Sequence, residues 1–347
     1  MIEKFEQIKD IEKTVLIPLE EIVAMDLNLS GVAVNRPYKR VRFNLLINDK
    51  HPLLFSLENN ELSLYNIQQS KLFFNDIFLF DISDLVEDSC EVFYTRKNGK
   101  VLCFNPNSRS SCNGCRFCYP PTSHDERQIS SNMLLSAFEE WLQKNQLTDL
   151  SHLEQVAVVT GCFKSEQMII DYLFKLRETL SALSFQNEIL YFGIISDFGN
   201  IDLLSKIKPL QLCFTIECFE NREKILLKNK NLDIDYLKEI MKKSVELGIT
   251  TTFSYILGLD SLTSIQKKMF LLKDFVTAFP IVSLFQTDDV RLQYRHADAN
   301  NLYYYLQSRK NIENIFANTT LKPNSWNNYR SLWRTCYGKN NESILLK

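Results

Sequence analysis

The sequence has no apolar run long enough to cross a bilayer. The longest runs, such as Ile189–Ile195, are far shorter than the roughly 20 residues that a transmembrane helix needs. The first 13 residues are charged throughout and lack the apolar stretch of a secretory signal. We therefore expect a cytoplasmic protein without a membrane partner.

An excess of one sign of charge is also missing. The 40 Lys and Arg residues and the 42 Asp and Glu residues are interspersed and give a net charge of −2. No broad basic surface is evident that could neutralise a phosphate backbone, which disfavours nucleic acid as a partner. Internal repeats and low-complexity segments are absent as well. A chain of 347 residues with this ordinary composition indicates one large folded domain and a smaller one.

The first hundred residues predict a mostly β unit. Short runs rich in β-branched and aromatic residues alternate there with turn signals at 58–60 and 98–99. A helical turn is expected within this unit at Ile22–Leu27. The expected strands are Val15–Pro18, Val41–Ile47, Leu53–Tyr65, Leu72–Phe80 and Glu91–Thr95.

Beyond residue 100, helical stretches alternate with short apolar runs, which is typical of βα units around a parallel sheet. The expected strands are Val101–Asn105, Val156–Thr160, Ile189–Ile195, Leu210–Ile216, Thr251–Leu257 and Ile281–Phe285. Right-handed crossovers would curl six such units into a partial barrel. We therefore predict an α/β fold, with a β-rich domain over residues 1–100, a partial (β/α)6 barrel over 101–290, and a helical and aromatic extension over 291–347.

Nine cysteines in a protein of the reducing cytosol do not indicate disulfides. Three of them, Cys112, Cys115 and Cys118, lie within seven residues, and Gly114 gives the loop backbone freedom. Two-residue gaps let a short loop wrap one inorganic cluster. A ferredoxin-type run would place a fourth cysteine where Thr122 stands. A cluster held by three thiolates would keep one iron open to a small molecule.

A structural zinc site is the alternative interpretation of the same thiols. His124 or Cys103 would then complete four ligands, and the chain would be a zinc-stabilised binding module without enzymatic activity. Structural zinc sites usually pair two well-separated ligand couples, which favours iron and sulfur here.

The cysteine triad and the βα units resemble the radical S-adenosylmethionine (SAM) superfamily over about residues 100 to 290, with no subfamily identified. Members carry a triad in the loop after the first barrel strand and an aromatic residue just before the third cysteine, as Phe117 is here. The commonest spacing is C-x3-C-x2-C, whereas this chain has C-x2-C-x2-C, which leaves Cys103 as a possible distant ligand. The resemblance implies a [4Fe-4S] cluster on Cys112, Cys115 and Cys118, with SAM as the second cofactor.

The resemblance also implies SAM-binding positions at the ends of the barrel strands. The turn after the second strand would meet the SAM amino group through backbone carbonyls. Glu217 would contact the ribose or the methionine carboxylate, with Arg222 as a carboxylate partner. The apolar and glycine residues of the fifth-strand motif, Tyr255–Leu259, would pack against adenine. The expected cofactor-binding residues are Phe117, Thr160, Gly161, Glu217, Arg222, Ile256, Gly258 and Leu259.

The reaction that this resemblance implies is reductive cleavage of SAM to a 5′-deoxyadenosyl radical, which abstracts hydrogen from a substrate. We expect a small-molecule or peptide substrate, of natural-product or modified-peptide type, and a reductant such as flavodoxin or ferredoxin. Cys162, Cys336 and Tyr329 are the candidate catalytic residues. Aromatic and basic residues of the tail could line a substrate pocket, namely Trp326, Tyr329, Arg330 and Trp333.

A transfer-RNA-modifying radical enzyme is a further alternative. It is motivated by Lys224, Lys228, Lys230 and the basic tail, although such lysines commonly form a solvated face.

Overall fold

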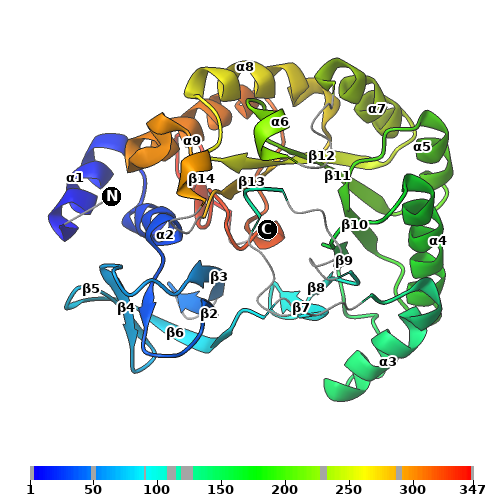
Figure 1. The fold of residues 1–347 in the computed structure, drawn as a ribbon, viewed down its shortest axis with the longest axis horizontal. Helices are drawn as coiled ribbons and strands as arrows, with labels where there is room; N and C mark the ends of the chain where they lie inside the picture. The colour runs from blue at the N-terminus through cyan, green and yellow to red at the C-terminus, as the bar shows by residue number, and fades with distance from the viewer. Residues whose placement is uncertain are drawn as a thin grey trace.

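The chain folds into a curved sheet with helices on its outer side and a smaller β unit at its open side (Figure 1). The computed structural model describes residues 4–47, 52–89, 91–107, 115–118, 128–226, 233–286 and 291–344. Within these residues, no helix combines the length and the apolarity needed to cross a membrane.

The amino-terminal unit begins with two helices and continues as a sheet. α1 (Phe5–Val15) and α2 (Leu19–Ser30) precede a six-stranded sheet in the order β1-β4-β5-β6-β2-β3. Its strands are β1 (Ala33–Val34), β2 (Arg40–Leu46), β3 (Pro52–Glu58), β4 (Tyr65–Gln68), β5 (Lys71–Phe74) and β6 (Ile77–Glu87).

The predicted strand at Val15–Pro18 is wrong, because Val15 ends α1. Phe5, Ile8 and Ile11 are buried at helical spacing, and Leu16, with φ of 57°, closes the helix by donating its N–H to Glu12. The helical turn predicted at Ile22–Leu27 is part of the longer α2.

Two other predicted strands each contain a turn. The stretch Leu53–Tyr65 includes the end of β3 and the start of β4, and Leu72–Phe80 includes the end of β5 and the start of β6. Asn75 lies between β5 and β6 with φ of 51°, a conformation that asparagine adopts in tight turns.

The second sheet has seven strands in the order β13-β12-β11-β10-β9-β8-β7. Six are parallel, and they confirm the predicted partial barrel. The seventh strand, β7, is antiparallel to β8 and lies before residue 100. The division of the chain into domains at residues 100 and 290 stays a prediction. The strands are β7 (Phe93–Arg96), β8 (Val101–Phe104), β9 (Gln155–Val158), β10 (Glu188–Gly193), β11 (Leu210–Glu217), β12 (Thr250–Leu257) and β13 (Ile281–Leu284).

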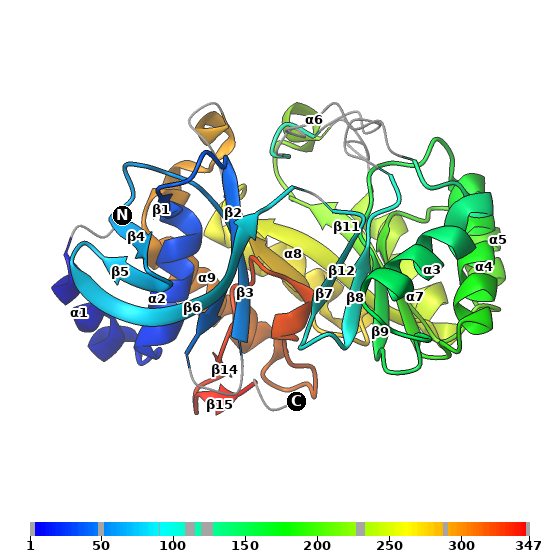
Figure 2. The ribbon, with the colours of Figure 1, turned by 90° about the horizontal axis from the view of Figure 1, so that it is seen from below.

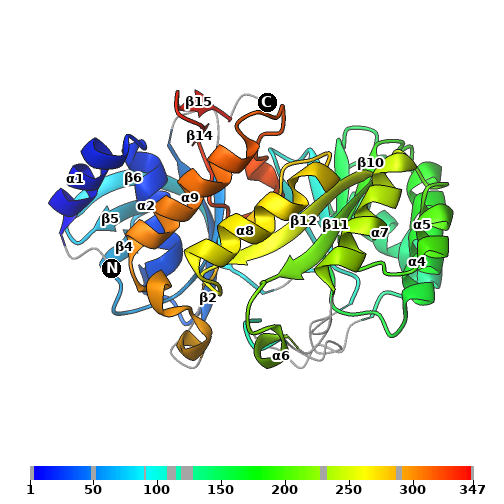
Figure 3. The ribbon, with the colours of Figure 1, turned by 90° about the horizontal axis from the view of Figure 1, so that it is seen from above.

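Helices follow the strands and cover the convex side of this sheet (Figures 1 and 3). They are α3 (Leu134–Lys144), α4 (Glu166–Ala182), α5 (Phe198–Leu204), α7 (Ile234–Glu246), α8 (Leu262–Leu272) and α9 (Leu302–Phe316). The short α6 (Arg222–Ile225) lies instead at the carboxyl ends of the strands (Figure 2). Short 3₁₀ turns lie at Ser131–Met133, Lys273–Phe275, Leu292–Tyr294, Ala297–Asn300 and Ser325–Asn327. Serine or aspartate side chains cap the first turns of several helices, as Ser165 does for α4 and Asp233 for α7.

The two faces of the barrel sheet differ in the size of their side chains. Large apolar residues on the convex face pack against the helices and form the main core. The concave face carries a separate cluster that includes the smaller Cys103, Ala157 and Cys213. This alternation follows the two-residue period of a strand.

The carboxy-terminal segment lies on the concave side and links the two edges of the barrel sheet (Figure 1). Ser331 bridges Ser283 of β13, and the ring of Tyr329 lies 6.5 Å from the ring of Tyr94 on β7. The segment ends in the hairpin β14 (Cys336–Tyr337) and β15 (Glu342–Ser343). Figure 2 shows this hairpin at the opposite end of the barrel from α6.

Candidate functional site

Several of the residues expected to bind the cofactors lie at the carboxyl ends of the parallel strands. Parallel strands place their carboxyl ends at one edge of a sheet, where barrel enzymes build their sites. Thr160 follows β9, Glu217 ends β11, and Gly258 follows β12. The cysteine loop follows β8 at the same edge. Cys112 lies outside the described residues, so the geometry below concerns Cys115 and Cys118.

The described part of the cysteine loop is a tight turn held by distant parts of the chain. The N–H of Cys118 donates to the carbonyl of Cys115 at 2.8 Å, and the N–H of Arg116 donates to Ile225 of α6 at 2.8 Å. Arg291 Nε donates to the carbonyl of Cys118 at 3.1 Å. Arg291, which the sequence analysis missed, therefore anchors the loop from beyond β13.

Cys115 and Phe117 pack against an apolar cluster at the strand ends. Its buried members come from the segments after β11, β12 and β13, and Ile256 packs against the same cluster. The structure thus brings together four of the residues expected in the site, Cys115, Phe117, Ile256 and Leu259. The buried members are Cys218, Ile225, Leu226, Leu259 and Phe285.

The turn after β9 is tied to the stem of the cysteine loop. The N–H of Asn107 donates to Thr160 Oγ1 at 3.1 Å, and the N–H of Gly161 donates to the carbonyl of Asn107 at 3.2 Å. Asn107 is the last described residue before the triad. The amide of Gly161 is therefore already engaged by the protein.

Glu217 ends β11 in an unusual backbone conformation. Its φ is 69°, and the pairing of β11 with β12 is irregular between Thr215 and Glu217. Ser254 Oγ donates to Glu217 Oε1 at a long 3.4 Å. Burial of the carboxyl group raises the pKa of Glu217 to about 7, and Ser254 and Arg222 offset only part of that effect. A non-glycine residue in this conformation costs about 1–3 kcal/mol and is typical of functional sites.

Arg222 begins α6 and is buried beside Glu217 and Cys115. Its Nη1 donates to the carbonyl of Ile216 at 2.6 Å and also to that of Cys218. Burial lowers the pKa of Arg222, whereas nearby Cys218 and Glu217 raise it. The guanidinium therefore holds the chain after β11 and also places a positive charge near the cysteine loop.

Gly258 occupies a position that only glycine fits. Its φ is 119°, and an added Cβ would lie 3.0 Å from Phe285 Cβ and 3.1 Å from Tyr305 Oη. Its carbonyl accepts the N–H of His296 at 2.8 Å. The backbone after β12 is thus tightly packed next to Leu259.

Asp260 is a buried carboxylate of the site region that the sequence analysis missed. It accepts hydrogen bonds from the N–H groups of Phe219 and Glu220 at 2.7 and 2.8 Å and from the Tyr255 hydroxyl at 2.7 Å. Burial nevertheless raises its pKa. Asp260 joins the loops after β11 and β12, and its place just after the predicted Gly258-Leu259 motif was the signal that could have identified it.

The candidate catalytic residues lie in three different places. Cys162 follows Gly161 and is partly buried at the strand ends. Cys336 lies in β14, where its N–H donates to Glu21 at 2.8 Å and its Sγ lies 3.2 Å from Arg309 Nη2. Tyr329 lies on the concave side beside Tyr94.

The other residues of the tail that were expected to line a substrate pocket also lie in different places. Trp326 lines a cavity at β7, and the Arg330 guanidinium lies 5.3 Å from the Tyr329 ring centre. Trp333 is 1% exposed and donates its Nε1 to Glu313 at 2.8 Å, so it belongs to the core. Lys224 is exposed on α6, and Lys228 and Lys230 lie outside the described residues.

The donors near the cysteine loop fit an iron–sulfur cluster. Cys115 and Cys118 carry thiol side chains, and thiolates are the usual ligands of such clusters. Within the described ranges, no three His, Cys, Asp or Glu side chains gather closely enough to hold a metal, and one member of the triad lies outside those ranges. Cys103 is fully buried on β8, where it is hydrogen-bonded to Tyr94 and Arg96.

No protein-family model matches the chain, and no curated protein matches its sequence. Similar solved structures include coproporphyrinogen III oxidase HemN from Escherichia coli, described as a radical SAM enzyme, with a TM-score of 0.44 and 16% identity over 63% of this chain and 52% of HemN. Streptococcus suis SuiB bound to SAM has a TM-score of 0.41 and 13% identity over 60% of this chain and 48% of SuiB. The hydrogenase maturase HydG from Carboxydothermus hydrogenoformans has a TM-score of 0.44 and 14% identity over 66% and 56% of the two chains. The chain thus matches about half the length of each of these proteins.

Proposed function

We propose that this chain is a radical SAM enzyme that holds a [4Fe-4S] cluster on Cys112, Cys115 and Cys118. One observation carries the proposal. Cys115 and Phe117 of the triad segment pack in the same apolar cluster as Ile256 and Leu259, at the carboxyl ends of a curved parallel sheet. The cysteine loop and the surface expected to bind adenine therefore adjoin, as a shared cluster and SAM site requires.

The residues of the chain have distinct tasks in this proposal. When bound, the cluster would supply the electron that cleaves SAM to a 5′-deoxyadenosyl radical. Ile256 and Leu259 would pack against adenine, and Gly258 between them allows the close approach of Phe285 and Tyr305. Glu217, with a pKa of about 7, would accept a hydrogen bond from the ribose when ionised. Arg222 would hold the loop after β11 and favour the SAM carboxylate nearby.

The enzyme would act on a small molecule or a peptide on the concave side of the sheet. Tyr329 lies on that side, and Cys162 lies at the strand ends. Their catalytic roles remain hypotheses. Replacement of Cys162 by Ala or of Tyr329 by Phe, with product turnover as the measurement, tests each of them. A flavodoxin or ferredoxin would supply the electrons.

Anaerobic reconstitution of the full chain tests the proposal. We expect a brown protein that contains iron and sulfide in cluster proportions and that releases 5′-deoxyadenosine from SAM under reductant. Cys115→Ala should lose both signals. Cys213→Ala is the matched control, because Cys213 is a fully buried thiol on the concave face, apart from the cysteine loop.

Two results would overturn the proposal. Stoichiometric zinc without iron or sulfide, in protein purified without oxygen, would support the zinc-stabilised module instead. A cluster-loaded protein that leaves SAM intact under strong reductant would exclude the reaction.

A further inference from the structure

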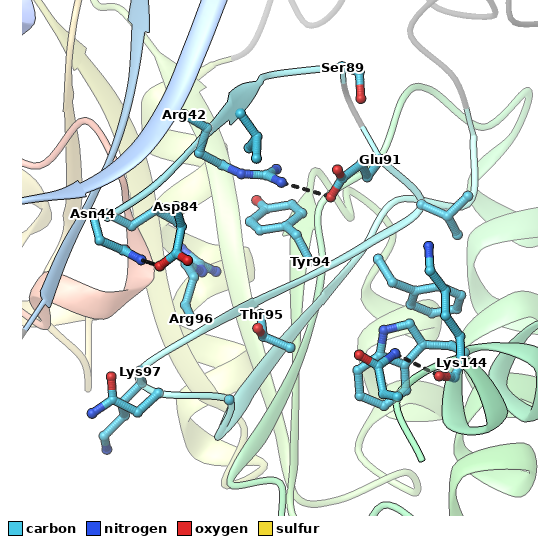
Figure 4. Close-up of a pocket in the computed structure, with 18 of the residues that line it drawn as sticks. Arg42, Asn44, Asp84, Ser89, Glu91, Tyr94, Thr95, Arg96, Lys97 and Lys144 are labelled. Carbon is cyan, nitrogen blue, oxygen red and sulfur yellow. Dashed lines mark hydrogen bonds and ion pairs between the residues drawn. The ribbon is translucent and has the colours of Figure 1, made fainter. Parts of the chain in front are cut away.

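A cavity of about 770 Å³ is lined by residues from both faces of β7. Phe93 belongs to the face that packs against α3, where its ring lies 6.0 Å from that of Trp141. Tyr94 belongs to the concave face, and the Arg42 guanidinium lies 5.7 Å from the centre of its ring. Figure 4 shows Thr95 on the opposite side of the strand from Tyr94. A cavity that contacts both faces of an outermost strand lies along the edge of that strand.

The two edges of the barrel sheet differ in how they are covered. At β13, the carboxy-terminal segment supplies main-chain partners, since the N–H of Leu284 donates to Arg330 at 2.9 Å. The N–H of Leu332 likewise donates to Val282 at 3.4 Å. At β7, no described strand or bridge pairs with the outer side. Folded proteins usually protect sheet edges, because unpaired main-chain groups are a template for another chain. The uncovered edge of β7 is therefore a candidate binding surface.

The hydrogen-bond pattern of β7 identifies the main-chain groups at this edge. The N–H of Asn105 donates to the carbonyl of Val92 at 2.7 Å, so these two residues are a hydrogen-bonded pair. Hydrogen-bonded and non-hydrogen-bonded pairs alternate in an antiparallel ladder, and the next pair, Phe93 with Phe104, is of the second kind. In agreement, the carbonyl of Phe104 accepts the N–H of Val159, just after β9, at 3.0 Å. The main-chain groups of Phe104 thus face β9, and those of Phe93 face the open edge.

Thr95 repeats this arrangement two residues further along β7. It pairs with Leu102, and the alternation makes this another non-hydrogen-bonded pair. The N–H and C=O groups of Phe93 and Thr95 therefore point away from β8, and Thr95 is itself exposed. These two residues are roughly 7 Å apart along the strand. An extended peptide carries donors and acceptors at the same spacing, so its main chain is complementary to this edge.

The walls of the cavity suit side chains that alternate in polarity. Ala137 and Trp141 of α3 lie on one side of β7, and Arg42 and Asn44 of the amino-terminal unit lie on the other. Arg42 already pairs with Glu91 at 2.9 Å, so its charge does not require an anionic ligand. Successive side chains of a strand added to β7 would point in turn to the apolar wall of α3 and to the polar wall.

We propose that an extended peptide binds along this edge as an additional strand, paired through its main chain with Phe93 and Thr95. The inference rests on the proposed function, and it adds that the substrate is a peptide. Phe93 pairs with Phe104, the last residue of β8, and the cysteine loop follows that strand. A peptide that continues beyond Phe93 would therefore reach the end of the sheet at which the cofactors are expected.

A phage-displayed library of random dodecapeptides tests this site, with the full chain purified without oxygen as the target. We expect enriched peptides in which apolar and polar residues alternate. Thr95→Pro should weaken their binding at least tenfold, because proline lacks the N–H that the peptide would use. β7 should stay paired with β8 in this variant, since that N–H takes no part in the ladder. Thr95→Val retains the N–H and should keep the affinity within threefold of the parent.

N-methylation of a synthetic copy of an enriched peptide, one residue at a time, gives a measurement that does not depend on the folding of a variant. Strand addition turns every second main-chain N–H of the peptide toward β7. Fluorescence anisotropy should therefore show a loss of affinity of at least tenfold at alternate positions and a small effect at the positions between them. Equal losses along the peptide, or no loss, would overturn the inference.

The remaining outcomes separate this inference from its alternatives. Absence of enriched peptides, or equal binding by the parent and Thr95→Pro, would also overturn it. A concentration-dependent dimer of the parent that Thr95→Pro abolishes would assign the edge to a second copy of the chain instead. A parent that binds the peptides at β7 but does not cleave SAM would refute the proposed function and leave the peptide site in place. A parent that cleaves SAM but binds no peptide would refute this inference alone.

Discussion

The carboxyl groups of Glu21 and Glu217 are both buried, but their surroundings differ in the number of hydrogen-bond donors and charges. Burial alone would raise the pKa of Glu21, yet the Arg309 guanidinium at 2.7 Å and the N–H groups of residues 334–336 lower it. Glu217 has one long hydrogen bond from Ser254, and its pKa rises to about 7. Where the amino-terminal and carboxy-terminal parts of the chain meet, the buried carboxylate of Glu21 has a cation and several N–H donors. At the strand-end site, the buried carboxyl group of Glu217 has one long hydrogen bond.

The largest effect is expected at Glu21. Glu21→Gln should lower the free energy of unfolding by about 3–5 kcal/mol at pH 7, because it removes the buried carboxylate that pairs with Arg309 at 2.7 Å and accepts from the N–H groups of residues 334–336, and it leaves Arg309 only Glu313 at 3.0 Å. Denaturant unfolding measures the loss. The neighbouring Glu20→Gln is the control and should change stability by less than about 0.5 kcal/mol. A loss below about 1 kcal/mol for Glu21→Gln would contradict the expected difference in stabilisation between the surroundings of Glu21 and those of Glu217.

Substitutions at two glycines, one in each of these regions, compare how closely the backbone is packed there. Gly258→Ala should cost about 3 kcal/mol, because the new methyl group meets Phe285 and Tyr305 in a left-handed conformation. Gly338→Ala, in the β14–β15 hairpin with φ of 77° and open space around it, should cost about 1 kcal/mol. Thermal unfolding of both variants checks the difference, and equal losses would contradict the tight packing at Gly258.

The raised pKa of Glu217 predicts a pH-dependent effect of about 2 kcal/mol. A folded-state pKa of about 7, above the ordinary 4.5, means that the stability from Glu217 is present below pH 4.5 and is lost as the pH rises through 7. Glu217→Gln should therefore be slightly more stable than the parent at pH 5, and this advantage should grow by about 2 kcal/mol by pH 8 in denaturant unfolding. Asp26, with a pKa of about 6, titrates in both proteins and cancels in the difference. A constant difference across this range would show that Glu217 ionises normally.

The smallest effect is expected for an exposed carboxylate. Lys97 and Lys100 both pair with Glu154 and lower its pKa, but the group is 43% exposed. Glu154→Gln should cost less than about 1 kcal/mol, because water screens surface pairs. The loss should shrink further in high salt, as measured by unfolding at two salt concentrations. A loss comparable with that of Glu21→Gln would mean that burial does not control these differences.

The sequence was most informative where a pattern repeats. The six parallel strands followed from short apolar runs between helical stretches, since each run is buried on both faces of the sheet. It was least informative in the amino-terminal unit, where the turn at Asn75 and the end of α1 at Val15 fall within predicted strands. Short apolar runs occur in helices as well as in strands, and contacts such as that of Phe5 of α1 with Phe74 of β5 arise only in the folded chain.

The sequence alone determined the cysteine spacing, the order of the βα units and the residue types at the strand ends, because these are properties of a linear pattern. Tertiary structure decided which side chains are short of partners. The anchoring of Cys118 by Arg291, the positive φ of Glu217 and the burial of Asp260 depend on neighbours from distant segments. Burial, charge pairing and backbone strain arise only when such segments meet, so no local pattern encodes them.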